Sequence, residues 1–482
     1  MRKESPAEMR TQATVLLTFT YLTVVSTAHP SPPVPCPEIP NAECGILQVA
    51  EDRSAVGGRV LDLDYVVIPA QREETSPPIF FLLGGPGEAA TSVAPFVPSS
   101  PLADLLDRRA LVLLDQRGTG GSHRLQCPPP DDPARHFGRL FDPVDVNACR
   151  EALVENADLR FYTTSIAVED LDELRRRLGY DRIALWGGSY GTRVAMEYLR
   201  RHGDLVERAV LDGVSGLDGT MPLYFAHDAQ AAFDRVVDDC ELESACSAAF
   251  PDLHADLAAA LDRLRDGPVV VEIAVGDGTS TATVPFSLGD LGYAIRGMLY
   301  SSRETAFLPA YLHAAATTGN FRAFAHIYYR RSASLGGELA NGMYLSVICA
   351  EDVPFITDEL ARRWSAGTFL GEYLIHDYRE ACGLWDRGEI PEDYRDGVRA
   401  DAPVLVLSGG RDPSTPPRWG ERAVEGLSNG RHIVFPYGGH GVADTPCGAA
   451  IVREFFAGAA PAELDASCVD DEGHRPAFKI PS

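Results

Sequence analysis

Short apolar runs that end in glycine recur along the chain and alternate with amphipathic segments. The run at 59–70 alternates like an antiparallel strand, and compact runs follow at 79–85, 110–118, 182–188, 208–214, 402–412 and 431–441. The segment 168–179 repeats leucine at intervals of three and four, as a helix does, and 192–203 has a similar character. Strands buried on both faces with helices between them predict a mostly parallel, doubly wound sheet covered by helices.

This alternation stops after about Leu217 and resumes near residue 400. The stretch between is rich in alanine and largely helical, with strand-like character only at VVVEIAV and TATVPFSL. A sheet that stops and resumes indicates an insertion. We therefore predict an α/β core formed by 29–217 and 400–482, with an inserted, largely helical lid domain at 218–399.

The first residues have the composition of a secretory signal peptide. Arg2, Lys3 and Arg10 precede a mainly apolar stretch, 13–25, and small residues follow up to Ala28. A retained anchor is the weaker alternative, because this stretch is short and rich in threonine. We expect cleavage after Ala28, no stable membrane insertion afterwards, and a mature protein that is secreted or held in the periplasm or cell envelope.

Ten cysteines follow that cleavage site and fall into five neighbouring couples along the sequence. They are Cys36 and Cys44, Cys127 and Cys149, Cys240 and Cys246, Cys349 and Cys382, and Cys447 and Cys468. An even count in an exported chain favours disulfides, and pairing of neighbours is the simplest of the possible schemes. The spacing offers no Cys-x-x-Cys or His-x-x-x-His pair, so we expect no metal.

Composition narrows the range of partners. The 482 residues include 43 basic and 69 acidic side chains, a net charge of −26, and 45% are hydrophobic. The negative net charge repels nucleic acid. The hydrophobic content is typical of a globular protein with a large core. The acidity also permits binding of cationic groups such as a free amine, although solubility alone would explain it.

The segment GGSYG, 187–191, is the sharpest chemical signal. It follows the apolar strand IALW and precedes the helical TRVAMEYL, which is the setting of a nucleophile elbow. Flanking glycines leave room for a strained turn that exposes the serine hydroxyl at the edge of the sheet. We therefore predict that Ser189 is a nucleophile.

A serine nucleophile needs a base and an acid that orients it, and in this fold the chain order is serine, acid, histidine. Asp412 follows the strand PVLVLSGG, and His440 follows HIVFPYGG in a glycine-rich turn. We assign His440 as base and Asp412 as its acid. An ordinary turn residue is the alternative at each position, more so for Asp412, because Asp-Pro is also a turn or helix-cap signal.

Backbone donors for an oxyanion are expected at the glycines of LGGPG, 83–87, after the strand IFFLL. We predict that Gly85 supplies one donor and that Tyr190, the residue after the nucleophile, supplies the other. A phosphate loop is less well supported, because no Lys-Ser/Thr follows these glycines.

The motifs LGGPG, DQRGTGGS, GGSYGTR, SGGRDPSTPP and GGHG together resemble those of the proline iminopeptidase and tripeptidyl aminopeptidase family of α/β-hydrolases. The exported, disulfide-containing branch, called TAP-like, is the most similar, through CGILQV, ICAEDVPF and the tail from Cys447 to Cys468. One departure is Leu83, where several relatives have histidine before the paired glycines.

The resemblance implies the same catalytic roles for Ser189, Asp412 and His440. It also implies that lid carboxylates hold the substrate's free amine, and Glu351 and Asp352 are the candidates, because a disulfide at Cys349 would fix that segment near the pocket. DQRGTGGS would be structural, with Asp115 and Arg117 able to form an internal ion pair.

Three classes of function remain open. The chain is expected to be a secreted serine exopeptidase that forms an acyl-enzyme, removes N-terminal residues or short peptides and needs no cofactor. A carboxylesterase with the same triad is the alternative, and an inactive binding protein comes third because no triad residue is missing. Epoxide hydrolases and dehalogenases need aspartate at the elbow, where this chain has Ser189. The expected partner is therefore a peptide or small ester; the sequence does not predict the oligomeric state.

Overall fold

A computed structural model describes residues 34–36, 39–276, 278–337, 339–471 and 477–480. The predicted signal peptide, 1–28, lies outside the described residues. No helix within those ranges is long and apolar enough to cross a bilayer.

Among the residues that the structure describes, nine strands form one sheet, in the order β1-β2-β3-β5-β4-β6-β7-β10-β11. β1 to β3 are antiparallel, β3 also runs antiparallel to β5, and the remaining neighbours are parallel. The strands are β1 (Val34–Pro35), β2 (Glu43–Ala50), β3 (Val60–Ile68), β4 (Ile79–Leu82), β5 (Leu111–Leu114), β6 (Ile183–Gly188), β7 (Val206–Asp212), β10 (Val404–Gly409) and β11 (Gly430–Phe435). Each predicted strand of the core is present, which confirms the α/β fold.

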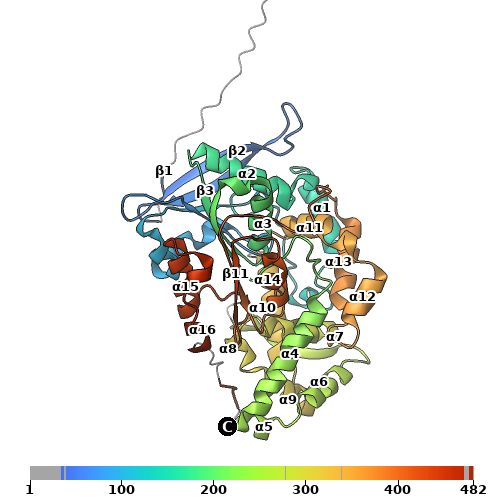
Figure 1. Cartoon of the computed structure of the whole chain (residues 1–482). Coiled ribbons are helices and arrows are strands. Elements are labelled where there is room, and N and C mark those ends of the chain that lie inside the picture. Colours follow the sequence, from blue (N-terminus) through green and yellow to red (C-terminus); the bar gives the residue numbers. More distant parts are fainter. Residues whose placement is uncertain (1–33, 37–38, 277, 338, 472–476, 481–482) are drawn as a thin grey trace, which may run out of the picture.

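Helices cover this sheet and supply the insertion (Figure 1). Those of the core are α1 (Pro143–Leu153), α2 (Thr164–Arg177), α3 (Tyr190–His202), α14 (Pro417–Val424), α15 (Pro446–Phe456) and α16 (Cys468–Asp471). Those between β7 and β10 are α4 (Phe225–Leu242), α5 (Ser244–Ala249), α6 (Leu253–Asp262), α7 (Leu288–Met298), α8 (Ser302–Thr305), α9 (Leu308–Thr318), α10 (Arg322–Gly337), α11 (Asn341–Glu351), α12 (Asp358–Ser365) and α13 (Tyr373–Leu384). A two-stranded sheet, β8 (Val269–Val275) and β9 (Ser280–Phe286), lies in the same interval.

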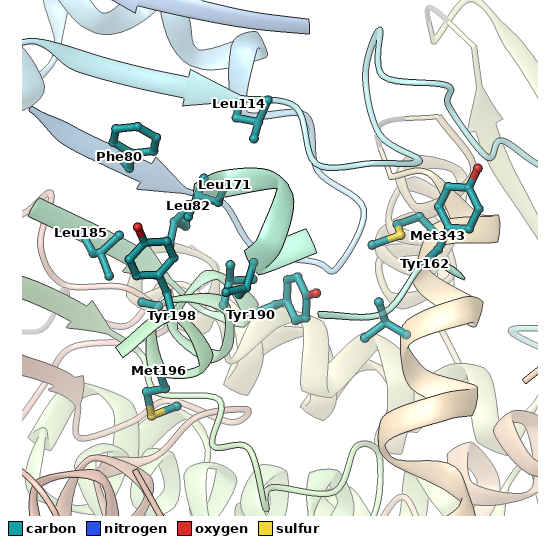
Figure 2. Packing of buried hydrophobic residues seen from close by; sticks show 14 of the residues in the cluster. Phe80, Leu82, Leu114, Tyr162, Leu171, Leu185, Tyr190, Met196, Tyr198 and Met343 are labelled. Carbon is teal, nitrogen blue, oxygen red and sulfur yellow. The ribbon is translucent and has the colours of Figure 1, made fainter. Parts of the chain in front are cut away.

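The helices between β7 and β10 have a hydrophobic cluster of their own, which includes Phe233, Phe324 and Tyr328. Helix α11 contributes to two clusters, because its Tyr344 belongs to this one and its Met343 to the cluster beneath the main sheet. Figure 2 shows Met343 beside Tyr162, and a Cβ on Gly118 would touch both side chains. The insertion is thus joined to the core through α11. The predicted lid limits, 218 and 399, fall between β7 and β10 and remain a prediction.

All ten cysteines are paired, and each is bonded to its neighbour in sequence. The simplest pairing scheme is therefore the one present in the structure. Cys349–Cys382 links α11 to α13 inside the insertion.

The loop after β5 is held by other contacts than we predicted. Arg117 is fully buried and pairs with Asp170 of α2, with 2.7 Å between Nη2 and Oδ1. Asp115 instead accepts hydrogen bonds from Thr91 and from the Gly121 N–H. The predicted Asp115–Arg117 pair is therefore wrong: Arg117 extends to the neighbouring helix, and backbone and hydroxyl donors satisfy Asp115.

A buried ionic cluster connects α3 to the end of α11. The Arg193 guanidinium contacts Asp352 at 2.8 and 3.1 Å and Glu351 at 3.4 Å, and all three side chains are fully buried. Glu351 also accepts bonds from the Thr164 N–H, at 2.6 Å, and from the hydroxyls of Thr164 and Tyr394. Burial raises the pKa of Glu351, and Arg193 acts in the opposite direction. Because a buried charge is costly without partners, this cluster holds α2, α3, the end of α11 and the segment at Tyr394 together.

Replacing Asp352 with asparagine is expected to lower the free energy of unfolding by about 3–5 kcal/mol, since Arg193 would remain buried without its main counter-charge. Urea unfolding followed by circular dichroism measures the difference. Asp358→Asn is the matched control: this carboxylate is 78% exposed and pairs with Arg379, so its loss should cost less than about 1 kcal/mol. Equal effects of the two substitutions would contradict the assignment.

Candidate active site

Ser189 lies at a strained turn between β6 and α3. Its backbone has φ 52° and ψ −122°, a conformation that non-glycine residues rarely adopt. The flanking glycines are required by close packing: a Cβ on Gly187 would lie 2.4 Å from the Gly191 carbonyl oxygen, and one on Gly191 would lie 2.0 Å from that of Leu82. The Ser189 N–H donates to the Asp212 carbonyl oxygen at 2.9 Å, which fixes the turn against β7. The local geometry is that of a nucleophile elbow.

His440 and Asp412 meet at the same edge of the sheet, after β11 and β10. His440 Nδ1 lies 2.8 Å from Asp412 Oδ2. The other carboxylate oxygen of Asp412 accepts the N–H groups of Ser414 and Thr415, at 2.8 and 2.9 Å, and the Thr415 hydroxyl donates to Oδ2 at 2.6 Å. These donors orient the carboxylate toward the imidazole. Sequence reasoning placed His440 and Asp412 correctly at this edge but did not single out Thr415.

The electrostatics of this pair favour a charged imidazolium. Burial lowers the pKa of His440, but the Asp412 carboxylate raises it by more, to about 9. Burial raises the pKa of Asp412, and His440 together with Thr415 lowers it to below the ordinary value. Asp412 is therefore ionised at neutral pH and stabilises a proton on His440.

Asp212, at the end of β7, shapes the turn that carries His440. Its carboxylate accepts the N–H groups of Val442 and Ala443 at 3.0–3.1 Å. Burial raises the pKa of Asp212 to about 6, although these amides oppose the shift. Sequence analysis missed this residue; the signal was available, because Asp212 follows a buried strand just as Asp412 does.

One cavity of about 700 Å³ brings most of the predicted residues together. Ser189, His440, Gly85 and Tyr190 all line it, whereas Asp412 lies behind His440 with 1% of its surface exposed. A Cβ on Gly84 would lie 3.2 Å from the Ser189 Cβ, so the glycine loop passes directly beside the serine. Gly85 has φ 100°, a conformation suited to glycine.

Glu351 and Asp352 lie outside the lining of this cavity. Both are fully buried and are occupied by Arg193 and its neighbours. The structure therefore does not bring the predicted amine-binding carboxylates to the substrate. Two other carboxylates, Glu88 and Asp444, are exposed and line the cavity. Neither stood out in the sequence, because single acids in glycine-rich loops are common.

Comparison with protein families gives two matches. Residues 77–270 match the model described as alpha/beta hydrolase fold, and residues 367–468 match the model described as TAP-like protein. Together they include the elbow, Asp412 and His440.

Curated relatives are hydrolases. The serine protease Hip1 of Mycobacterium tuberculosis is 25% identical over 419 residues, covering 78% of this chain and 77% of the relative. A probable proline iminopeptidase of Streptomyces coelicolor is 31% identical over 140 residues, covering 29% of this chain and 33% of the relative.

A solved structure of proline iminopeptidase from Mycobacterium smegmatis aligns over 86% of this chain and 98% of its own length, at 17% identity and a TM-score of 0.43. The fold, the two matched segments and the relatives agree with the resemblance in the sequence motifs. The chain has the α/β-hydrolase fold, and its C-terminal segment 367–468 is similar to TAP-like proteins.

Proposed function

We propose that the chain is a serine exopeptidase in which Ser189, His440 and Asp412 form the catalytic triad. The observation that carries this proposal is the strained Ser189 turn, which lines the same cavity as the Asp412-bonded His440. Serine and histidine in one cavity, with a buried acid behind the histidine, are the parts that acyl transfer requires.

In this mechanism His440 takes the proton of the Ser189 hydroxyl as Oγ attacks the scissile carbonyl. The proton then passes to the leaving amine as the C–N bond breaks, which leaves an acyl group on Ser189. Water, deprotonated by His440, attacks that ester and releases the acid. Asp412 keeps Nδ1 protonated throughout, so that Nε2 is the nitrogen that exchanges the proton.

The N–H groups of Gly85 and Tyr190 are proposed as the oxyanion donors. Gly85 follows the glycine that lies beside Ser189, and Tyr190 opens α3 immediately after the nucleophile. The Tyr190 side chain is held away from this role, because its hydroxyl bonds to Gln116 and Thr164 inside the core. Its backbone position is thereby fixed.

For the substrate amine we now propose Glu88 in place of the buried lid pair. Glu88 Oε2 accepts a hydrogen bond from the Gly84 N–H at 3.2 Å, which places this carboxylate close to Ser189. An ammonium group held near the nucleophile selects peptides by their free N-terminus. A carboxylate that is exposed in the cavity can make this contact; Glu351 and Asp352 cannot without breaking the Arg193 cluster.

Export belongs to the same proposal. Five disulfides persist only in an oxidising environment, and the N-terminal sequence has the features of a signal peptide.

Ser189→Ala is expected to lower kcat/KM by about four to six orders of magnitude, because the acyl-enzyme can no longer form. A fluorescent phosphonate should label the wild-type protein once and the variant not at all, as read by intact-protein mass spectrometry. Ser215→Ala is the control, since this serine also lines the cavity. Labelling that persists in Ser189→Ala would show that another residue is the nucleophile.

The pH profile should follow the protonation of His440. Only the neutral imidazole can take the serine proton, and Asp412 raises the pKa of His440 to about 9. kcat/KM should therefore increase with pH, with a midpoint above the usual value of about 6.5. Asp412→Asn removes the charge that raises this pKa, so the midpoint should move to lower pH while the maximal rate falls by about 10⁴. A midpoint that does not move would contradict the role of Asp412.

The substrate class is tested with alanine 4-nitroanilide, its N-acetyl derivative and 4-nitrophenyl acetate. We expect the free amide to react roughly 10- to 100-fold faster than the acetylated one, since acetylation removes a charge-assisted contact. Glu88→Gln should abolish most of this preference, and Ser189 should still form the acyl-enzyme. Asp444→Asn, at the other exposed carboxylate, shows how much of the effect belongs to Glu88 alone. If only the ester reacts, the chain is a carboxylesterase.

A further inference from the structure

Arg296, near the end of α7, is buried at the cavity wall and has no acidic partner among the residues that the structure describes. It is 5% exposed and lines the same cavity as Ser189. Its Nη2 donates to the Tyr300 hydroxyl at 2.7 Å and to Ser414 Oγ at 3.1 Å. Its Nε is buried and donates to no residue that the structure describes.

The other buried arginines are all compensated. Within the described residues they are Arg109, Arg117, Arg175, Arg193 and Arg208, and each forms an ion pair with an aspartate or glutamate. Arg296 alone in this group lacks one, in a protein whose net charge is −26. Acidic side chains are thus abundant, yet in the described part of the chain none forms an ion pair with this buried guanidinium at the cavity wall.

Tyrosines surround Arg296 instead. The side chains that act most strongly on it are Tyr300, Tyr293, Tyr378 and Tyr344, and all four line the cavity. Burial raises the pKa of Tyr300, while Arg296 and His440 lower it by more, which makes its hydroxyl a better hydrogen-bond donor. A guanidinium with hydroxyl donors around it is suited to an anion with two oxygens.

Contacts within the protein offset only part of the cost of this burial. The guanidinium carbon of Arg296 lies 3.9 Å from the centre of the Phe225 ring, and the carboxyl end of α7 is favourable for a cation. Neither supplies a full negative charge. A bound carboxylate would do so, and it would also supply the acceptor that Nε lacks.

We propose that Arg296 binds a carboxylate of the substrate, so that this hydrolase prefers peptides with a negative charge near the scissile bond. The carboxylate is either the free C-terminus of a short peptide or the side chain of an acidic residue, and both present the same group to Arg296. This inference rests on the proposed peptidase function and extends it.

The anion site lies on the histidine side of the cavity. Tyr300, which bonds to Arg296, accepts the His440 N–H through its carbonyl oxygen at 3.0 Å, and its ring lies 4.9 Å from the imidazole. Ser414, the other partner, is two residues beyond Asp412 and donates its N–H to that carboxylate. A charge bound here is therefore close to the group that gives the leaving amine its proton.

Two pairs of amide substrates distinguish the two sources. The first pair is trialanine and its C-terminal amide, and the second is the 4-nitroanilides of glutamate and glutamine. Wild-type protein should prefer the charged member of at least one pair by roughly 10- to 100-fold in kcat/KM, the value of a hydrogen-bonded charge pair. Arg296→Gln should remove that preference.

Arg331→Gln is the matched control. Arg331 also lines the cavity but already pairs with Glu304, at 2.6 Å, so the preference should survive its replacement. Equal rates for both members of both pairs in the wild type, or a preference that persists in Arg296→Gln, would overturn the proposal.

A third pair separates this inference from the peptidase assignment. If no amide is cleaved, the exopeptidase function fails, yet 3-acetoxybenzoate and 3-acetoxybenzamide still compare a charged with a neutral ester.

Binding to the Ser189→Ala protein, measured by calorimetry with trialanine and its amide, needs no turnover and no variant of Arg296. If the two ligands bind this protein equally well, Arg296 is not a site for the peptide C-terminus, and the side-chain pair alone decides.

Discussion

The buried contact between Arg193 and the Asp352–Glu351 pair is the interaction on which the arrangement of the site depends. Arg193 lies one turn beyond Ser189 in α3, and its partners lie at the end of α11. With both sides fully buried, neither helix can shift without separating charges in a medium where water cannot replace the lost contacts. Helix α3, which follows the Ser189 turn, and helix α11 of the insertion are thus held in one fixed arrangement.

Sequence alone was sufficient wherever function depends on local chain geometry. The strained turn at Ser189 could be predicted because it needs glycines on either side and a strand and a helix around it, all within a few residues. His440 and Asp412 could be placed because the ends of parallel strands meet at one edge. The cysteine pairs were also local, with separations of 6 to 33 residues.

The errors concern charged residues whose partners are distant in the chain. Glu351 and Asp352 have the composition of a solvated loop, and their burial depends on Arg193, 158 and 159 residues away. Arg117 likewise finds Asp170 rather than its near neighbour Asp115. The sequence did not point to Arg296, because only the packing around it shows that no described acidic side chain pairs with it. The role of a carboxylate depends on whether an arginine pairs with it in the folded chain. Hydrophobic periodicity does not predict such a pairing.

The hydrogen bond from the His440 N–H to the Tyr300 carbonyl has a consequence for how substrates enter. Tyr300 belongs to the insertion, so the wall of the cavity and His440 are joined by a backbone hydrogen bond. A hinge movement of that wall would therefore either break this hydrogen bond or move His440 away from Ser189. The wall at Tyr300 and His440 therefore behave as one unit, and a substrate has to fit the cavity in the form that this unit gives it.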